Sequence, residues 1–393
     1  MKNKSLVVFM SHPIQYISPL MFKLSENLEL EVYYYSDIGV NGKSDLGFGH
    51  KVAWDIPLLD NYKFSFLKNW SPRKSMDCRF WDAVNFGVWG VLRKSKGDIV
   101  MVNSWTYCSD LMVIFVSFLF SKKVWIRAEN PLNQELHRSG SKVMLKRAFL
   151  KYFLFKFFID KFLYIGSQNK LFYEYFGVSP ADLIFSPYAV DNLRFSGEYS
   201  ALKPLGNVIK SELCIPEDAK VVLYVGKLIE KKRPFDLLKA FEMLNSLNLY
   251  LVFVGDGPLR SDLERDVVNN NLSNVIFTGF INQTQISRFY TIANVLVVCS
   301  GYGETWGLVV NEALNFDTPI ILSETTGCNF DLINHGVNGF VFEEGDCNSL
   351  SYYLNSILSG DFDFEKSNEL TKTNLELYSL ETNVNNIKTF VNE

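Results

Sequence analysis

The stretch NVLVVCSGYGETWGLVVNEAL, at residues 294–314, predicts a strand, a glycine-rich loop and a helix in direct succession. The apolar, β-branched run at 294–300 is typical of a buried strand. Glu304 then lies at the strand end, and Glu312 lies inside the following helix. Ligands of α/β sheets bind at this edge, where helix N-termini attract phosphates. The stretch therefore indicates an α/β fold with two carboxylates at a ligand-binding edge.

The same alternation of strand and helix extends in both directions from this stretch. Apolar runs with β-branched and aromatic residues are separated by segments of helical length, which is typical of βαβ units and a parallel sheet. The alternation of strands and helices begins anew in the second half of the chain, so we expect two doubly wound sheets. The runs lie at residues 5–10, 28–35, 98–103, 123–128, 161–166, 183–186, 220–226, 249–257, 274–280, 294–300 and 318–323.

The length of 393 residues suits two domains. Residues 187–207 lose periodicity and gather Pro, Gly and Ser, so we expect the boundary there. We assign residues 1–195 to an N-terminal domain and 196–375 to a C-terminal domain. Residues 376–393 are expected to form a helix that packs back towards the N-terminal domain. The polar stretch at 359–376 is expected to be a connector.

Composition excludes several classes of protein. With 48% apolar and 21% charged residues and a net charge of −4, neither a disordered chain nor a nucleic-acid partner is expected. The six cysteines form no CxxC pair, and no leader is expected, which favours a reduced, cytoplasmic setting. The apolar stretch at 111–120 is too short to span a membrane and predicts a buried helix.

Four cations follow the first strand of the second half: Lys227, Lys231, Lys232 and Arg233. Cations at a strand's carboxyl end suit a diphosphate, although a lone cluster is also typical of a solvated turn. The glutamates at 304 and 312 would repel phosphate but can accept hydrogen bonds from sugar hydroxyls. Each alone could equally be a surface charge. Together, the two features favour a nucleotide sugar.

Five spaced blocks of the second half occur together: GKLIEKKRPFDLL, VGDGPLRSDLE, NVIFTGFINQTQISRFY, SGYGETWGLVVNEAL and DLINHGVNGFVFEEGD. In this order they resemble the C-terminal half of the group 1, family 4-like glycosyltransferases of GT-B fold. PYAVDNLRF resembles the family's interdomain segment. The resemblance implies two Rossmann-like, doubly wound domains facing a central cleft. It also implies transfer with retention of configuration, with no metal and no cofactor beyond the nucleotide sugar.

The resemblance also assigns roles by position. Lys227 and Lys232 match the family's basic residues on the diphosphate, and Glu304 matches the glutamate on the donor sugar. Glu312 matches the glutamate on the ribose hydroxyls. Further donor contacts would come from the backbone at Trp306, Gly307 and Leu308, and from the backbone around Phe280 at the base.

The first half resembles relatives that carry an HPIQY sequence after the first strand. This places His12 at a strand's carboxyl end, either as an acceptor-side or leaving-group contact or as a capping or packing residue. Glu129 ends another predicted strand and is a second candidate on the acceptor side. The DxD at residues 361–363 lies in the polar tail, so chance explains it better than a metal site.

Residues 142–158 combine five cations with many aromatic residues. Such a helix could lie on an anionic membrane surface, or it could be a core helix whose lysines reach water.

The sequence thus predicts an enzyme that moves a hexosyl or related group from a nucleotide sugar to a glycan or lipid-linked acceptor. The resemblance implies bacterial surface polysaccharide synthesis, in the cytoplasm or at the inner face of the membrane. A nucleotide-sugar epimerase or hydrolase and a non-catalytic donor-binding subunit remain as alternatives.

Overall fold

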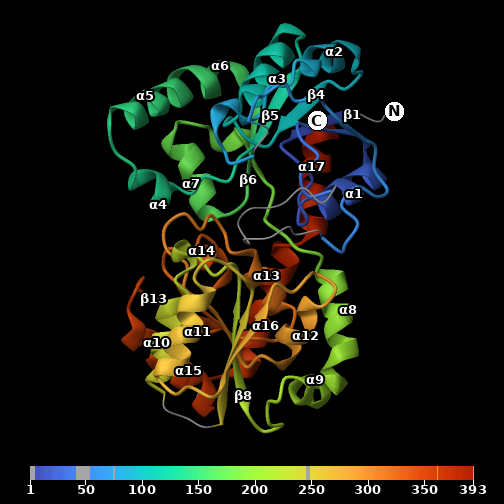
Figure 1. Ribbon diagram of the computed structural model, residues 1–393. Coiled ribbons are helices and arrows are strands. Elements are labelled where there is room, and N and C mark those ends of the chain that lie inside the picture. Colours follow the sequence, from blue (N-terminus) through green and yellow to red (C-terminus); the bar gives the residue numbers. More distant parts are fainter. Residues whose placement is uncertain (1–4, 41–53, 74–75, 245–247, 361, 393) are drawn as a thin grey trace. The chain divides into compact units, whose positions relative to one another are not determined.

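The computed structural model describes residues 5–40, 54–73, 76–244, 248–360 and 362–392 (Figure 1). The chain divides into two compact units, and each is described by itself. Unit 1 contains Met1–Ser44, Pro57–Tyr188 and Leu380–Glu393, and unit 2 contains Asp45–Ile56 and Ala189–Ser379.

Unit 1 is built on a parallel sheet of seven strands in the order β3-β2-β1-β4-β5-β6-β7. β1 pairs with both β2 and β4, so the strand order reverses there and the sheet is doubly wound. The strands are β1 (Ser5–Met10), β2 (Glu29–Tyr34), β3 (Phe64–Phe66), β4 (Ile99–Val102), β5 (Lys123–Arg127), β6 (Lys161–Tyr164) and β7 (Leu183–Phe185).

The helices of unit 1 pack on this sheet around a core of Val, Ile, Leu and aromatic side chains. They are α1 (Ser18–Asn27), α2 (Gly87–Lys94), α3 (Cys108–Leu119), α4 (Leu132–Leu136), α5 (Ser141–Phe149), the π-helical turn η3 (Leu150–Leu154), α6 (Phe155–Phe158), α7 (Ser167–Tyr175) and α17 (Leu380–Asn392), with the short turns η2 (Phe80–Asp82) and η4 (Pro180–Asp182).

Unit 2 repeats the architecture with six parallel strands in the order β10-β9-β8-β11-β12-β13. The strands are β8 (Lys220–Val225), β9 (Leu249–Val254), β10 (Val275–Gly279), β11 (Val295–Val298), β12 (Ile320–Ser323) and β13 (Gly339–Phe342). The helices are α8 (Asn192–Leu202), α9 (Gly206–Glu212), α10 (Pro234–Glu242), α11 (Arg260–Asn269), α12 (Ile286–Ile292), α13 (Leu308–Leu314), α14 (Asn329–Leu332), α15 (Cys347–Ser359) and α16 (Phe364–Leu377), with the turns η5 (Lys203–Leu205) and η6 (Glu230–Lys232).

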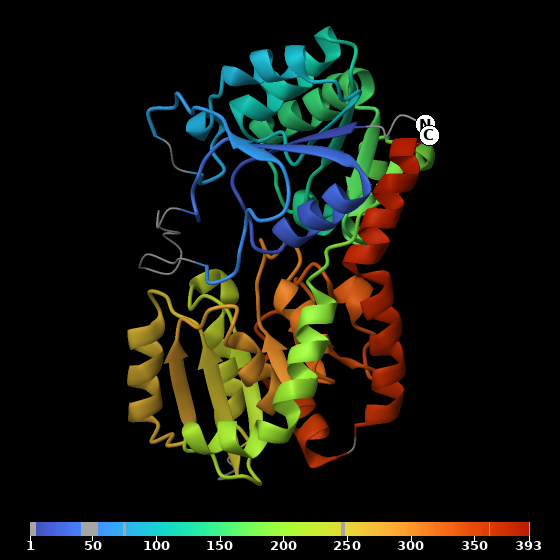
Figure 2. The same ribbon diagram turned by 90° about the vertical axis from the view of Figure 1, so that its right-hand side faces the viewer.

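The last helix, α17, belongs to unit 1 although it follows unit 2 in the chain. It lies beside α1 in both ribbon views (Figures 1 and 2). Lys23 of α1 forms an ion pair of 2.7 Å with Glu381. The Asn383 amide accepts a hydrogen bond from the Ser186 hydroxyl and donates one to the Pro187 carbonyl, both at 2.9 Å. These contacts attach the chain end to α1 and to the residues after β7.

Two segments that show no apolar period in the sequence are helical. α8 occupies much of the stretch at 187–207 because the Asp191 carboxylate caps it, accepting from the Arg194 N–H at 3.1 Å. α16 replaces the connector expected at 359–376, and Asp363 caps it in the same way, at 3.0 Å from the Lys366 nitrogen. The boundary between the units lies between Tyr188 and Ala189, within the stretch at 187–207. The connector expected at 359–376 was wrong because a polar helix lacks the apolar period that the sequence pattern relies on.

Residues 142–158 form one continuous helix, α5-η3-α6. Its buried side chains are those of Leu150, Leu154 and Phe155, and α5 contributes none. Leu150, Leu154 and Phe155 belong to the core of unit 1, as the core-helix alternative expects, whereas most other side chains of this helix lie at the surface. The membrane alternative stays a prediction. The helix expected at 111–120 is α3, which is largely buried but exposes Phe118 and Leu119 at its end.

Candidate active site

The candidate site lies at the carboxyl edge of the sheet in unit 2. β8 and β11 are neighbouring parallel strands, so the loops that follow them emerge side by side. Lys227 lies in the loop after β8, and Lys232 ends the short turn η6 in the same connection. Glu304 lies in the loop that joins β11 to α13. The topology thus brings the predicted cations and the first glutamate to one place.

Lys232 and Glu304 form a direct ion pair. The Nζ of Lys231 lies 4.0 Å from the same carboxylate oxygen of Glu304. The Lys232 side chain is only 21% exposed and the Glu304 side chain only 12%, so the solvent screens their charges weakly. Burial alone would raise the pKa of Glu304, but Lys232 and Lys231 outweigh burial and lower the pKa below its ordinary value. Glu304 is therefore held as a carboxylate.

Backbone hydrogen bonds fix the loop that carries Glu304. The Gly301 N–H donates to the Lys231 carbonyl at 2.8 Å, which joins this loop to the basic turn. The Ser300 carbonyl accepts from the Thr325 hydroxyl at 2.6 Å, and the Glu304 carbonyl accepts from the Gly327 N–H at 3.2 Å. The position of the glutamate is thus set by two other connections of the sheet, those that follow β8 and β12.

Two glycines are required where this loop enters α13. Gly307 has a φ of 101°, in the left-handed region that favours glycine. A Cβ on Gly327 would lie 2.0 Å from the Thr305 carbonyl oxygen, so the two loops could not approach as they do.

The backbone at Trp306, Gly307 and Leu308, predicted to bind the donor, forms the entry to α13. Gly307 is the residue before the helix, and Leu308 is its first residue. The first N–H groups of a helix have no partner within the helix. The Trp306 indole is buried, donates to the Asn311 side chain at 2.8 Å and packs on Tyr378, so this ring is structural.

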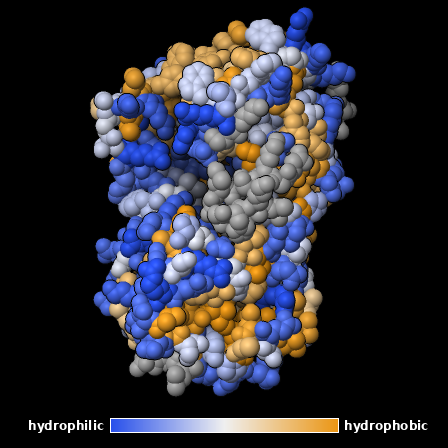
Figure 3. All heavy atoms as spheres, viewed as in Figure 1, coloured by the Kyte–Doolittle hydropathy of each residue, from blue (hydrophilic) through white to orange (hydrophobic). Residues whose placement is uncertain are grey.

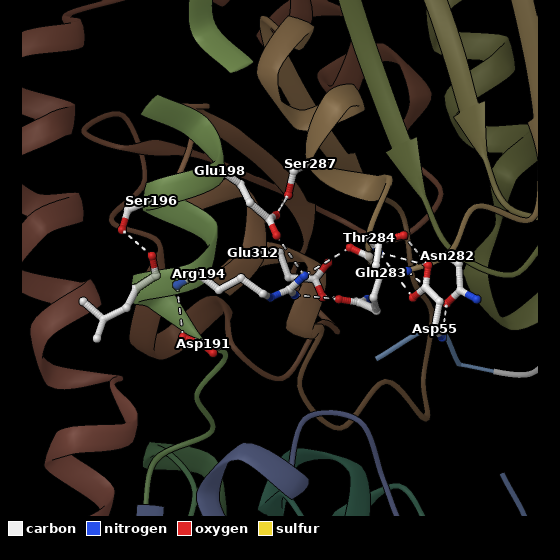
Figure 4. Close-up of polar contacts among 11 residues, drawn as sticks. Asp55, Asp191, Arg194, Ser196, Glu198, Asn282, Gln283, Thr284, Ser287 and Glu312 are labelled. Carbon is white, nitrogen blue, oxygen red and sulfur yellow. Dashed lines mark hydrogen bonds and ion pairs between the residues drawn. The ribbon is translucent and has the colours of Figure 1, made fainter. Parts of the chain in front are cut away.

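Glu312 lies in the second turn of α13 and is buried in a polar network (Figure 4). The Tyr290 hydroxyl of α12 donates to one carboxylate oxygen at 2.6 Å, and Gln283 Nε2 lies 3.5 Å from the other. Burial raises the pKa of Glu312 above its ordinary value, although Tyr290, Arg194 and Gln283 oppose the rise. The two glutamates therefore have opposite electrostatic environments.

Arg194 of α8 positions Gln283 through two hydrogen bonds. Its Nη2 donates to the Gln283 side-chain oxygen at 2.8 Å, and its Nη1 donates to the Gln283 carbonyl at 3.1 Å. Figure 4 shows the Arg194 side chain extending from α8 towards Gln283 and Glu312. No motif in the sequence marks Arg194, Gln283 or Tyr290 as site residues. The first lies in PYAVDNLRF and the others in NVIFTGFINQTQISRFY, so the quoted blocks were the available signal.

Phe280, expected near the base, follows β10. The Trp54 ring packs edge-on against the Phe280 ring with centroids 6.0 Å apart. Next to it, the Thr284 N–H donates to an Asp55 carboxylate oxygen at 3.2 Å (Figure 4). Residues from the first half of the chain thus contact the loop predicted to bind the base.

Arg233 has a structural role rather than the phosphate role considered for the basic cluster. Its Nε lies 2.6 Å from Asp236, and its Nη1 lies 3.2 Å from Glu344. It also takes a left-handed φ of 47° just before α10. Its charge is therefore balanced by carboxylates of the protein.

His12 and Glu129 both follow strands of unit 1, as the sequence predicts. His12 comes after β1, with its Nδ1 at 3.0 Å from the Ser11 hydroxyl. Glu129 comes after β5 and pairs with the buried Arg127 at 3.4 Å. The neighbouring strands β4 and β5, and β1 and β4, are paired, so both residues lie at the carboxyl edge of one sheet.

The sequence DFD at 361–363 was considered as a metal motif. Its last residue, Asp363, instead caps the N-terminus of α16. Asp361 lies outside the described residues. In the part of the chain that the structure describes, no group of three or more His, Cys, Asp or Glu residues could hold a metal ion.

Part of unit 2 is similar to a known family of proteins. Residues 207–376 match the family model described as glycosyl transferases group 1. The uncharacterized glycosyltransferase MJ1607 of Methanocaldococcus jannaschii is 31% identical over 169 residues, which cover 42% of this chain and 43% of that protein.

A second relative comes from Campylobacter jejuni and is named GalNAc-alpha-(1->4)-GalNAc-alpha-(1->3)-diNAcBac-PP-undecaprenol alpha-1,4-N-acetyl-D-galactosaminyltransferase. It is 29% identical over 213 residues, which cover 53% of each protein. The chain thus matches about half the length of these curated relatives.

Among solved structures, Anabaena Alr3699/HepE in complex with UDP superposes with a TM-score of 0.74 at 14% sequence identity, covering 99% of both chains. At this identity the likeness concerns the fold. The chain therefore has the GT-B fold of two Rossmann-like units, and its second unit contains the segment that matches the glycosyl transferases group 1.

Proposed function

We propose that the chain is a retaining glycosyltransferase that moves a hexosyl or related group from a nucleotide diphosphate sugar to a glycan or lipid-linked acceptor. The observation that carries the proposal is the buried contact of Lys232 with Glu304, at the sheet edge that also holds Lys227. A diphosphate needs cations, and a sugar ring needs hydrogen-bond acceptors, so one ligand accounts for both.

In this proposal unit 2 binds the donor. Lys227 and Lys232 neutralise the diphosphate and stabilise the charge that grows on it as it leaves. An ammonium group has three donors, so Lys232 can hold Glu304 and a phosphate oxygen at once. Glu304 accepts hydrogen bonds from the transferred sugar, and the backbone at the entry to α13 adds donors. Because the lysines carry the neutralisation, no step in the proposal requires a metal.

Glu312 would bind the ribose hydroxyls. A carboxylate offers about four acceptor sites. Tyr290 and Gln283 approach one oxygen each, which leaves capacity for two hydroxyl donors. The backbone around Phe280 would contact the base.

The acceptor would bind to unit 1, where His12 and Glu129 are the candidate contacts. The leaving phosphate would take the acceptor proton itself, so the proposal needs no protein base. The name of the Campylobacter relative specifies an undecaprenol-linked acceptor, which supports a lipid-linked acceptor here. Such an acceptor favours action in the cytoplasm at the inner face of the cell membrane, within bacterial surface polysaccharide synthesis.

Calorimetry with two conservative variants tests the donor site. Glu312→Gln should weaken both a nucleotide sugar and the bare nucleoside diphosphate, by about 10- to 150-fold, because both ligands carry the ribose. Glu304→Gln should spare the bare diphosphate and depress sugar transfer. Uridine, guanosine and adenosine diphosphates and their sugars would be compared. Equal loss of diphosphate affinity in both variants would contradict the division of roles.

Turnover assays separate the proposal from its alternatives. A donor-consumption rate that does not respond to any acceptor would indicate an epimerase or hydrolase. Donor binding without transfer, over a panel of glycan and lipid-linked acceptors, would indicate a donor-binding subunit. Lys227→Ala and Lys232→Ala should each reduce diphosphate affinity and transfer by roughly one to three powers of ten.

A further inference from the structure

One face of unit 1 concentrates exposed aromatic and aliphatic side chains. It is formed by α2, the end of α3 and the helix α5-η3-α6, and we call it the α3–α6 face. Contacts between rings join its parts: Trp89 of α2 lies 5.3 Å from Phe120, and Phe118 lies 5.0 Å from Phe158. In Figure 3, apolar residues gather at the end of unit 1 where Figure 1 shows α3 and α6.

The side chains on this face are far more exposed than core residues. Leu145 is 74% exposed, Tyr152 is 65% exposed and Leu119 is 64% exposed. The face further includes Trp89, Phe118, Met144, Phe149, Phe153 and Phe157, each at least 36% exposed. Contiguous apolar surface of this kind marks an interaction site in a folded protein.

The segments that build this face carry charges of one sign. Residues 86–97, 111–123 and 141–158, which build it, contain ten Lys and Arg residues and no Asp or Glu. The whole chain has a net charge of −4, so these segments differ in charge from the chain as a whole. Lys142, Lys151 and Lys156 are exposed among the aromatic residues.

Two of the cations on this face are already engaged. Arg147 binds the buried Glu135 at 3.0 Å, and Lys122 donates to the carbonyls of Ser95 and Gly97. These two hold the fold together. The exposed cations of the face, among them Lys142, Lys151 and Lys156 on the aromatic helix, are available for an external partner.

An open pocket of about 550 Å³ lies on the face between the end of α3 and α6. Phe118, Phe157 and Phe158 line it, and Lys156 lines it as well. Asp160 also lines it, but a carboxylate oxygen of Asp160 accepts from the Val124 N–H at 2.7 Å. The pocket thus combines apolar walls with a cation.

We propose that the α3–α6 face docks unit 1 on an anionic lipid bilayer. Aromatic rings and aliphatic side chains enter the interface between headgroups and acyl chains, and lysines bind the phosphates. The charge decides between occupants, because the three segments that build the face carry ten cations and no carboxylate, and the adjoining Asp160 is engaged by the Val124 N–H, whereas an ordinary protein surface carries mixed charges. None of the described helices has the length and apolarity to span a bilayer, so docking is peripheral. The proposal does not depend on glycosyl transfer.

Co-sedimentation of the full chain with vesicles tests the proposal. The wild type should sediment with vesicles of phosphatidylcholine and phosphatidylglycerol, and salt should weaken the binding. Each lysine near an anionic surface changes the partition by about fivefold, so Lys142→Ser, Lys151→Ser and Lys156→Ser together should weaken binding about 100-fold. A second variant, Leu145→Ser with Tyr152→Ser and Phe157→Ser, should also lose binding.

The matched control changes the same net charge in unit 2. Lys239, Lys366 and Lys372 are exposed there, and their replacement by serine should leave sedimentation unchanged. Thermal unfolding followed by circular dichroism verifies that each variant is folded. The proposal is overturned if the wild type sediments with neither phosphatidylcholine vesicles nor the anionic ones. It is also overturned if the control loses binding equally, or if the apolar variant binds like the wild type.

Discussion

Replacing Lys232 by methionine tests the ion pair at the centre of the candidate site. Methionine keeps an unbranched apolar side chain but lacks the ammonium group, so Glu304 would keep Lys231 at 4.0 Å as its nearest described cation. Removing one partner of a buried pair costs about 3–5 kcal/mol because the other charge stays buried. Both side chains keep some exposure, so we expect the lower end, about 3 kcal/mol of unfolding free energy at neutral pH.

The pH dependence of this loss gives the sharper test. In the wild type the pKa of Glu304 is lowered, so its contribution to stability is present above the unfolded pKa and is lost as pH falls through the folded pKa. Without Lys232, burial should dominate and raise the pKa of Glu304. The contribution of the variant is then present below the unfolded pKa and is lost as pH rises. The stability difference between the two proteins should therefore grow from about pH 4 to pH 7.

Denaturant unfolding at several pH values measures both quantities, and Lys231→Met is the matched control. It removes the same charge from the neighbouring residue, whose side chain is 42% exposed and lies farther from Glu304. An exposed pair contributes about 0–1 kcal/mol, so this variant should lose little stability. If both variants unfold alike, with parallel pH profiles, Lys232 does not hold Glu304 and the account of the site is wrong.

Two further predictions concern buried groups. Tyr290→Phe removes the 2.6 Å hydrogen bond to Glu312, so calorimetry should show about a 10-fold loss of nucleoside diphosphate affinity. The control Tyr352→Phe changes an exposed residue and should leave this affinity unchanged. Unchanged affinity in Tyr290→Phe would refute the positioning role of Tyr290. Burial raises the pKa of Asp110 to about 6, so its contribution is full below its unfolded pKa and is lost as pH rises through about 6. Asp110→Asn should lack this loss. Between pH 4 and pH 7 the unfolding free energy of the wild type should fall by about 2.4 kcal/mol relative to that of the variant. Parallel stability curves would contradict the shift.

The sheets were largely predictable because their central strands are continuous apolar runs. Each of the eleven runs listed from the sequence contains a strand of the structure. The two missed strands, β3 and β13, lie at sheet edges and have three and four residues. Ser65 and Phe66 in β3 are exposed, so no buried pattern marks that strand. Edge strands need only one neighbour and can be too short to show a period.

The helix α16 escaped prediction for a related reason. Its buried positions are Ser367, Thr371 and Asn374, which follow the helical period with polar side chains. The Asn374 amide donates to the Leu332 carbonyl at 2.8 Å, so this helix is held partly by hydrogen bonds. Apolar periodicity cannot detect such a face. The capping residue Asp363 was the available signal, and it was considered only as part of a metal motif.

In the candidate site, too, some contacts follow from the strand order and could be predicted, whereas others depend on how helices pack and could not. The approach of Lys232 to Glu304 follows from two strand ends at one sheet edge, which the alternation of strands and helices predicts. The contacts of Glu312 depend instead on how α8 and α12 pack beside α13. Arg194 is more than a hundred residues from Glu312 in the chain, and no local pattern relates them. Packing of this kind becomes visible only in the structure.

The different surroundings of the two glutamates bear on how one ligand could use both. Glu304 faces cations, so its charge is already balanced, and a phosphate would compete with it for the Lys232 ammonium group. Such competition would raise the pKa of Glu304 and couple its contact with a sugar to the departure of the diphosphate. Glu312 has neutral donors at both oxygens, and its pKa is raised, which makes it the more basic acceptor for hydroxyl groups. In the proposed mechanism the first glutamate would thus sense the leaving group, whereas the second would be insulated from it and would suit a group that stays unchanged throughout transfer, as the ribose does.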